Sequence, residues 1–164
     1  MLNKHVLVTG ASGFCGFHVA MNLAKAGHKI TAVVRTPNDR TNVLSKIEGV
    51  QIIIGDLAGE VVLPQQIDAV VHTAATSPGE GVNRSDSIMI RDNVVATSRL
   101  IDHCRKVKIR FFIYFSSLSV YGDIRDHTVD ENTVISDPDI YGVTKYLGEL
   151  MLAESTSAFQ SLII

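Results

Sequence analysis

Short apolar runs alternate with longer amphipathic segments along the chain. The runs are bounded by turn residues and cover 5–8, 29–34, 50–54, 68–72, 110–116 and 161–164. Such runs are typical of strands buried on both faces of a parallel sheet. Between them, apolar positions recur with a helical period at about 14–26, 41–47, 85–107 and 140–158, most weakly at 41–47. The pattern predicts an α/β fold with a doubly wound parallel sheet and right-handed crossovers.

The C-terminal third carries two further signals. Segment 118–139 is polar, rich in turn residues and without a strand pattern, which in a compact domain indicates a functional or mobile loop. The last apolar run ends the chain with no turn or polar tail after it. We therefore expect residues 1–164 to form one domain that is the first half of a longer protein. The alternative is that the sheet simply ends there.

Composition narrows the class of protein. The 164 residues are 46% hydrophobic and 20% charged with a net charge of −2, as in a soluble globular domain. Scattered basic residues argue against nucleic acid or an anionic membrane as a partner, and the apolar runs are too short to span a bilayer. There is no signal-peptide pattern, and Cys15 and Cys104 have no metal-ligand spacing. We expect a reduced, cytoplasmic protein without a metal site.

The first candidate site is the glycine loop TGASGFCG, which follows the first predicted strand and opens the first predicted helix. Gly10 permits a tight turn, Gly13 lets the backbone approach a pyrophosphate, and Gly16 lets the helix pack against the sheet. The helix N-terminus then offers amides and a partial positive charge to phosphates. A loop of this composition at this junction indicates nucleotide binding.

The end of the second predicted strand bears on the choice of cofactor. NAD sites commonly place an acid there to accept hydrogen bonds from the ribose 2′-hydroxyl, whereas an arginine suits the 2′-phosphate of NADP. Arg35 occupies this neighbourhood, so NADP is favoured over NAD. Asp39 leaves NAD open as the cofactor. The alternative interpretation of Arg35 is that it is a solvated arginine at the end of a strand.

A tyrosine and a lysine form the candidate catalytic pair. Tyr141 and Lys145, in YGVTK, are four residues apart and share one helix face. A free tyrosine has a pKa of about 10 and is a poor base at neutral pH, but a nearby ammonium favours the phenolate and lowers that value. Ser117 follows the fifth strand, at the sheet edge where ligands bind in open α/β folds. The alternative is an ordinary amphipathic pair.

In combination these motifs resemble the extended short-chain dehydrogenase/reductase superfamily, especially its nucleotide-sugar epimerases, dehydratases and reductases. TGASGFCG resembles its phosphate loop, GDL at 55–57 its adenine-contacting segment, VVHTAA at 70–75 its fourth strand, and FSSLSVYG at 115–122 its serine motif. The resemblance covers the whole chain. It implies a Rossmann fold with strand order 3-2-1-4-5-6 that lacks the C-terminal substrate-binding part.

The resemblance also assigns site residues. It implies that Ser117, Tyr141 and Lys145 are catalytic, that Asn93 supports the active site, and that Lys145 also hydrogen-bonds the nicotinamide ribose. The cofactor-binding residues it implies, together with the arginine discussed above, are Gly10, Ser12, Gly13, Phe14, Gly16, Arg35, Asp56, Leu57, Thr73, Ala74, Ala75, Tyr141 and Lys145.

The expected function is that of an NAD(P)-dependent oxidoreductase, epimerase or dehydratase acting on a nucleotide-sugar. One alternative is a reductase or dehydrogenase of a steroid-like or other small carbonyl compound, and another is a non-catalytic NADP-binding sensor. The superfamily builds most of its substrate pocket after the sixth strand, so we expect this chain alone to bind cofactor but to turn over slowly or not at all. The helices near 85–107 and 140–158 are the usual dimer face, which leaves a homodimer open.

Overall fold

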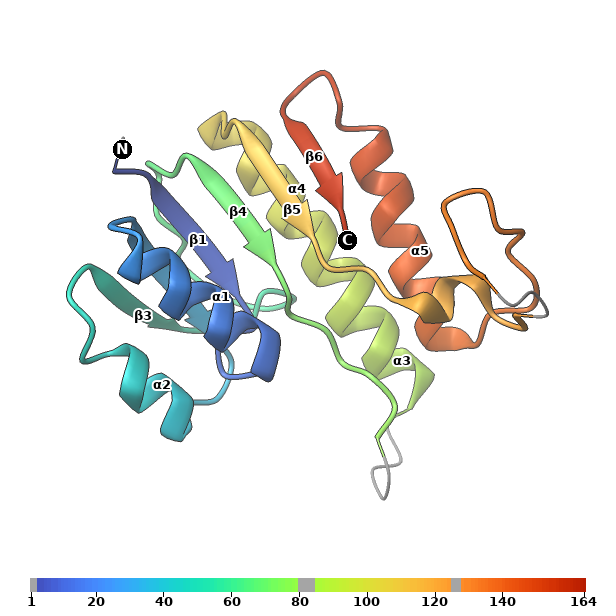
Figure 1. Cartoon of the computed structure of the whole chain (residues 1–164), viewed down its shortest axis with the longest axis horizontal. Helices are drawn as coiled ribbons and strands as arrows, with labels where there is room; N and C mark the ends of the chain where they lie inside the picture. The colour runs from blue at the N-terminus through green and yellow to red at the C-terminus, as the bar shows by residue number, and fades with distance from the viewer. Residues whose placement is uncertain (1–2, 80–84, 125–127) are drawn as a thin grey trace.

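A computed structural model describes residues 3–79, 85–124 and 128–164. The strands are β1 (His5–Thr9), β2 (Lys29–Val34), β3 (Val50–Ile54), β4 (Ala69–His72), β5 (Phe111–Tyr114) and β6 (Gln160–Ile163). They pair in parallel in the order β3-β2-β1-β4-β5-β6 (Figure 1). The predicted doubly wound sheet and its strand order are confirmed. Among the described residues, no helix is long and apolar enough to cross a membrane.

Helices cover both faces of the sheet. The helices are α1 (Phe14–Lys25), α2 (Asp39–Leu44), α3 (Asp86–Met89), α4 (Ala96–Val107) and α5 (Ile140–Ala153). In Figure 1, α1 and α2 lie on the near side of the sheet, and α4 and α5 lie behind it. Because the chain builds outward from β1 in one direction and from β4 in the other, right-handed crossovers place the two helix sets on opposite faces.

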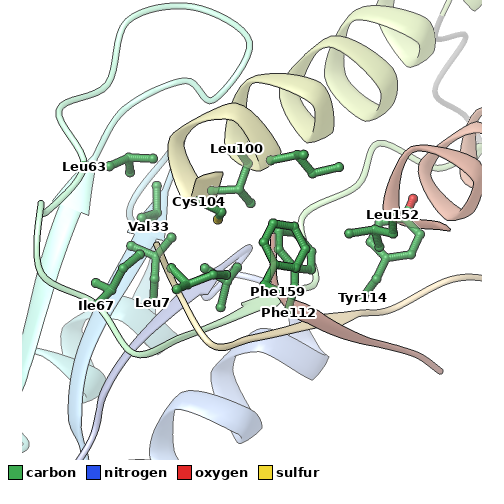
Figure 2. Packing of buried hydrophobic residues seen from close by; sticks show 13 residues of the cluster. Leu7, Val33, Leu63, Ile67, Leu100, Cys104, Phe112, Tyr114, Leu152 and Phe159 are labelled. Carbon is green, nitrogen blue, oxygen red and sulfur yellow. The ribbon is translucent and has the colours of Figure 1, made fainter. Parts of the chain in front are cut away.

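Alternating strand residues divide the core into two layers. In β1, Leu7 packs with the α4 and α5 layer, whereas Val6 and Val8 pack with the α1 and α2 layer. Figure 2 shows the first layer, where the rings of Phe112 and Phe159 stack with centroids 5.6 Å apart. Burial on both faces explains why the runs of β1, β2 and β4 are apolar throughout. The edge strand β6 differs from the prediction, because all four of its residues are exposed.

The helices differ from the predicted segments in two places. The segment predicted as one helix at 85–107 contains a π-helical turn, Ile90–Val95, between α3 and α4. The helix predicted to reach residue 158 ends at Ala153. The Ser155 hydroxyl donates to the Met151 carbonyl, and serine and threonine residues of this kind favour turns over helix. The predicted loop 118–139 includes a 3₁₀ turn, Leu118–Tyr121.

We expect Gly148→Ala to destabilise the protein, although alanine is the better helix former. Gly148 lies in α5 against the buried Tyr114, and an added Cβ would come within 2.6 Å of the ring carbon Cζ of that tyrosine. Overpacking of this kind costs about 1–3 kcal/mol, which exceeds the gain of about 1 kcal/mol in helix propensity. Urea unfolding measures the difference in free energy of unfolding.

Lys106→Ala, at an exposed position of α4, is the matched control. Its free energy of unfolding changes by no more than about 0.5 kcal/mol. If Gly148→Ala were as stable as this control, the close contact between α5 and Tyr114 would not constrain the fold.

Candidate functional site

A cavity of about 280 Å³ opens at the carboxyl ends of β1, β2 and β4. This is the point where the strand order reverses, because β1 lies between β2 and β4. Ligands of open α/β sheets bind at such switch points. The lining residues are Gly10, Ser12, Gly13, Val33, Arg35, Thr36, Gly55, Asp56, Leu57, Thr73, Ala74, Ala75, Thr76, Asp92 and Ala96.

The glycine loop has the geometry that its sequence predicts. Gly10 has a φ of +70°, which favours glycine, and its amide donates to the Val33 carbonyl at 3.1 Å. Gly13 is the N-cap of α1 and carries no side chain that could occupy the helix N-terminus. A Cβ at Gly16 would lie 2.5 Å from the Gly10 carbonyl oxygen, so Gly16 sets the approach of helix to loop. The N-terminus of α1 therefore faces the cavity through a loop of small residues.

Two predicted cofactor-binding residues of this loop do not line the cavity. The Phe14 side chain is 67% exposed, and its ring contacts that of His18 at a centroid distance of 4.7 Å. Gly16 lies one helical turn further along and packs against the loop backbone. The structure gives Gly16 a packing role and leaves Phe14 on the outer surface of α1.

The segment after β4 forms the opposite wall. The Thr73 hydroxyl donates to the Thr9 carbonyl at 2.7 Å, and the Ala74 amide donates to the Thr9 hydroxyl at 3.3 Å. That same hydroxyl hydrogen-bonds Nδ1 of the buried His72 at 2.6 Å. These bonds fix the Thr73–Ala75 backbone across the cavity from the glycine loop.

Four charged side chains meet at one corner of the cavity. Arg35 Nη1 lies 2.5 Å from Asp92 Oδ2. Arg91 contacts Asp92 Oδ1 at 2.8 Å and also pairs with Asp56. Arg35 is thus ion-paired, whereas the prediction of NADP assumed a cation free to meet a 2′-phosphate. The physical reason is the π-helical turn, which carries the Asp92 carboxylate to the end of β2.

The acids of this corner are held in their charged form. Burial works to raise the pKa of Asp92, but hydrogen bonds from Arg35, Thr76 and Arg91 hold it below its usual value. A hydrogen bond from Arg91 is the main reason that the pKa of Asp56 is also lowered. The corner is therefore a network of full charges at neutral pH.

Asn93 joins the cavity wall to helix α5. Its Oδ1 accepts from the Thr76 amide at 2.7 Å, and its Nδ2 donates to the Thr76 carbonyl and to the Thr144 hydroxyl, each at 2.9 Å. The side chain is buried, and these contacts use both of its polar atoms. Asn93 therefore holds the Thr73–Thr76 segment at a set position relative to Tyr141 and Lys145, as a positioning residue.

Ser117 and Tyr141 approach each other where α5 meets the 3₁₀ turn. Gly142 makes this possible, since a Cβ there would lie 2.8 Å from the Ser119 carbonyl carbon. The Asp139 carboxylate caps the helix by accepting from the Gly142 amide at 2.7 Å. Burial raises the pKa of Tyr141, and a hydrogen bond with Ser117 partly opposes that rise. The two hydroxyls are thus neighbours on half-buried positions.

Lys145 follows Tyr141 by one helical turn and is 2% exposed. Its ammonium sits 4.0 Å from the ring centroid of Tyr114 in a cation–π contact. Burial lowers the pKa of Lys145 to about 8, against an opposing effect of Glu149. The expected lowering of the Tyr141 pKa is not what this structure shows: the phenol's own desolvation dominates, and the ammonium faces Tyr114.

Sequence reasoning found most of the cavity wall but missed several lining residues. Val33 and Thr36 carry no motif and line the cavity through their place in the fold. Asp92 is the important omission, and its position directly before Asn93 was the available signal. In the described ranges, no group of three or more His, Cys, Asp or Glu side chains could hold a metal ion.

A family model matches almost the whole chain. The NAD dependent epimerase/dehydratase family aligns with residues 6–164. A D-erythronate dehydrogenase from Cupriavidus necator is 32% identical over 92% of this chain and 50% of its own length. A UDP-glucose 4-epimerase from Yersinia pestis is 30% identical over 92% of this chain and 48% of its own length. The chain spans about half the length of these curated relatives.

Solved structures give the same match. The UDP-glucuronic acid 4-epimerase from Bacillus cereus, in complex with NAD, superposes with a TM-score of 0.83 at 30% identity. The match covers 97% of this chain and 55% of that one. A UDP-galactose 4-epimerase superposes with a TM-score of 0.86 at 25% identity over 97% of this chain and 54% of that one.

We expect Lys145→Met to stabilise the protein at pH 7. The pKa of Lys145 falls from 10.5 to about 8, so between these values the unfolded chain binds a proton that the folded protein has released. Stability therefore rises with pH in that window, and below pH 8 the folded state carries the cost of a buried charge, about 3 kcal/mol. Urea unfolding of both proteins from pH 7 to 10.5 measures the effect.

The exposed Lys25 of α1 provides the matched control, as Lys25→Met. This variant keeps the wild-type dependence of stability on pH, whereas Lys145→Met loses the part due to the buried ammonium. An unchanged pH dependence in Lys145→Met would show that the ammonium is adequately solvated.

Proposed function

The chain belongs to the NAD-dependent epimerase/dehydratase family, and from that premise we propose that it uses NAD to oxidise a nucleotide-linked sugar during epimerisation or dehydration. The observation that supports the proposal is the set of hydrogen bonds that Asn93 makes to Thr76 and Thr144. It connects the wall of the switch-point cavity to the helix that bears Tyr141 and Lys145. A cofactor site and a proton-transfer site thus share one rigid frame.

The residues present fit a dinucleotide. The N-terminus of α1 can hold the pyrophosphate through its amides and dipole, because Gly13 leaves it uncovered. Asp56 and Leu57 line the side expected for adenine, and Thr73–Ala75 supplies backbone on the other wall. We propose NAD in place of the NADP predicted from Arg35, because that arginine already has a carboxylate partner.

The proposed chemistry places a proton on Tyr141. Ser117 hydrogen-bonds the reacting sugar oxygen, and the Tyr141 phenolate takes the proton from that hydroxyl. NAD, when bound, accepts the hydride from the same carbon. Lys145 follows Tyr141 by one helical turn, and its ammonium would favour the phenolate once it turns from the Tyr114 ring toward the phenol. In epimerisation the hydride would return to the opposite face of that carbon while Tyr141 gives its proton back to the oxygen, so the cofactor would end unchanged.

A second candidate is a dehydrogenase of a small hydroxy acid. It is favoured by the 32% identity to a D-erythronate dehydrogenase, whose substrate carries no nucleotide. The proton-transfer residues would act in the same way on that substrate. A non-catalytic NADP-binding sensor is the least favoured function, since it would have no need of Ser117, Tyr141 and Lys145 together.

We also propose a homodimer through the helices behind the sheet. Large apolar side chains along this surface stay more than a third exposed, namely Ile88, Ile90, Val95, Val143, Leu147 and Leu150. They come from α3, the π-helical turn and α5, which are neighbours in the fold. An apolar stripe shared by adjacent helices is typical of a helix-pairing interface.

Gly13→Asp should weaken cofactor binding and leave the stability of the fold unchanged. The backbone of Gly13 is extended, as N-cap residues require, and a Cβ there meets only the Gly10 carbonyl oxygen, at 3.2 Å. Aspartate caps helices slightly better than glycine, so thermal stability is kept. Its carboxylate would occupy the place proposed for the pyrophosphate, and NAD affinity falls at least about tenfold. Calorimetric titration measures the affinity.

The neutral variant Gly13→Asn caps the helix equally well and controls for side-chain size. We expect it to lose less affinity than Gly13→Asp. Equal NAD binding by the aspartate variant and the wild type would place the phosphates elsewhere and remove the proposed cofactor site.

Tyr141→Phe should abolish proton transfer while cofactor binding stays within about threefold. Loss of a general base lowers the rate by about 10²–10⁴. Because turnover is expected to be slow, a single-turnover assay with protein in excess follows NADH absorbance after addition of UDP-glucose, UDP-glucuronate or D-erythronate. The substrate that reduces NAD separates the two candidate functions.

Tyr146→Phe, on the same helix, is the matched control and retains the wild-type rate. A Tyr141→Phe protein as fast as the wild type would exclude Tyr141 as the base.

A further inference from the structure

The ion pair between Arg35 and Asp92 bridges two separate parts of the fold. Arg35 follows β2, and Asp92 belongs to the π-helical turn before α4. Their contact, Nη1 to Oδ2 at 2.5 Å, spans the corner of the cavity, and both residues line it. Any group bound at the end of β2 therefore meets the pair and not an isolated arginine.

Asp92 is the fixed member of the pair. Its side chain is 6% exposed, whereas that of Arg35 is 54% exposed. The carboxylate also accepts from the Thr76 hydroxyl at 2.7 Å and from Arg91 Nη1 at 2.8 Å. With three donors from three segments, the carboxylate stays in place, and the longer arginine side chain reaches to it.

We infer that Asp92 determines cofactor specificity by withholding Arg35 from a 2′-phosphate, so that the site selects NAD over NADP. This inference rests on the proposed function, in which the cavity binds a dinucleotide. Asp92 acts through Arg35 and is a positioning residue for the choice of cofactor, with no part in proton transfer.

The charge balance of the corner supports this assignment. Arg35 and Arg91 carry two positive charges, and Asp56 and Asp92 carry two negative charges, so the four side chains sum to zero. A 2′-phosphate would meet the Arg35 guanidinium, whose charge is already balanced by Asp92. The Asp92 carboxylate next to it would repel the phosphate. The 2′-hydroxyl of NAD is neutral and avoids that cost.

A further cation near the glycine loop, Arg40, is also engaged. Arg40, in α2, donates from Nη1 to the Ser12 carbonyl at 3.3 Å, and Asn38 donates to the same carbonyl at 3.0 Å. Both side chains hold the glycine loop to the start of α2. Release of Arg35 is therefore the most direct way to create a phosphate site here.

A double-mutant cycle tests the inference. Isothermal titration gives the dissociation constants of NAD⁺ and NADP⁺ at one ionic strength for the wild type, Asp92→Asn, Arg35→Ala and the double variant. The wild type binds NAD⁺ more tightly. Asp92→Asn keeps the shape and an acceptor oxygen but loses the charge, and the affinity ratio shifts toward NADP⁺ about tenfold, the value of one charge-assisted contact. The double variant loses that shift, because it lacks the released arginine.

Asp102→Asn is the matched control. It removes another ion-paired carboxylate, on the exposed side of α4, and leaves the ratio unchanged. If Asp92→Asn keeps the wild-type ratio, or if the double variant retains the shift, the inference is wrong while dinucleotide binding stands. If neither nucleotide binds the wild type, the proposed function fails and the inference with it.

The wild type alone gives a test that does not depend on the folding of any variant. In competition against bound NAD⁺, 5′-AMP should bind at least as tightly as 2′,5′-ADP, which adds only the 2′-phosphate. A preference for 2′,5′-ADP of more than about tenfold would show that Arg35 reaches the phosphate despite Asp92.

Discussion

The reversal of strand order between β1 and β4 is the constraint on which the rest of the structure depends. Parallel strands with right-handed crossovers must place successive helices on opposite faces once the direction of growth reverses. The loops that leave β1 and β4 consequently diverge, and the cavity lies between them. Hydrogen bonds from Thr73 and Ala74 to Thr9 tie these loops together and so fix the width of the opening.

Polar groups buried near the cavity position its wall and its neighbouring helix, and their burial costs stability. Asn93 uses both amide protons and its carbonyl oxygen on Thr76 and Thr144, which ties the cavity wall to α5. Lys145 is a stronger case, since a nearly buried ammonium is held by an aromatic face and not by a carboxylate. Strain of this kind is characteristic of sites under functional selection.

Local patterns in the sequence predicted the strands and the glycine loop. A buried strand requires consecutive apolar residues, and a tight turn requires glycine, so both can be seen in a short stretch of sequence. Ser117, Tyr141 and Lys145 were identified by motif, and their roles stay predictions. The pairing of Arg35 with Asp92 could not be predicted, since 57 positions separate them and only the folded sheet brings them together. The π-helical turn was not predicted for a related reason. It changes the helical period over six residues, and this stretch is too short to alter the pattern of apolar positions. The direction in which the pKa of Tyr141 shifts depends on desolvation of the phenol. The spacing of Tyr141 and Lys145 in the sequence gives no information on that desolvation.

The π-helical turn has a consequence for how the protein can change over evolution. Adjacent residues on it serve different neighbours, because Asp92 turns to the end of β2 while Asn93 turns to α5. A change at the first position alters the electrostatics of the cavity corner and leaves the connection to α5 intact. Because adjacent helical residues face different directions, mutations at these two positions can alter one trait without the other.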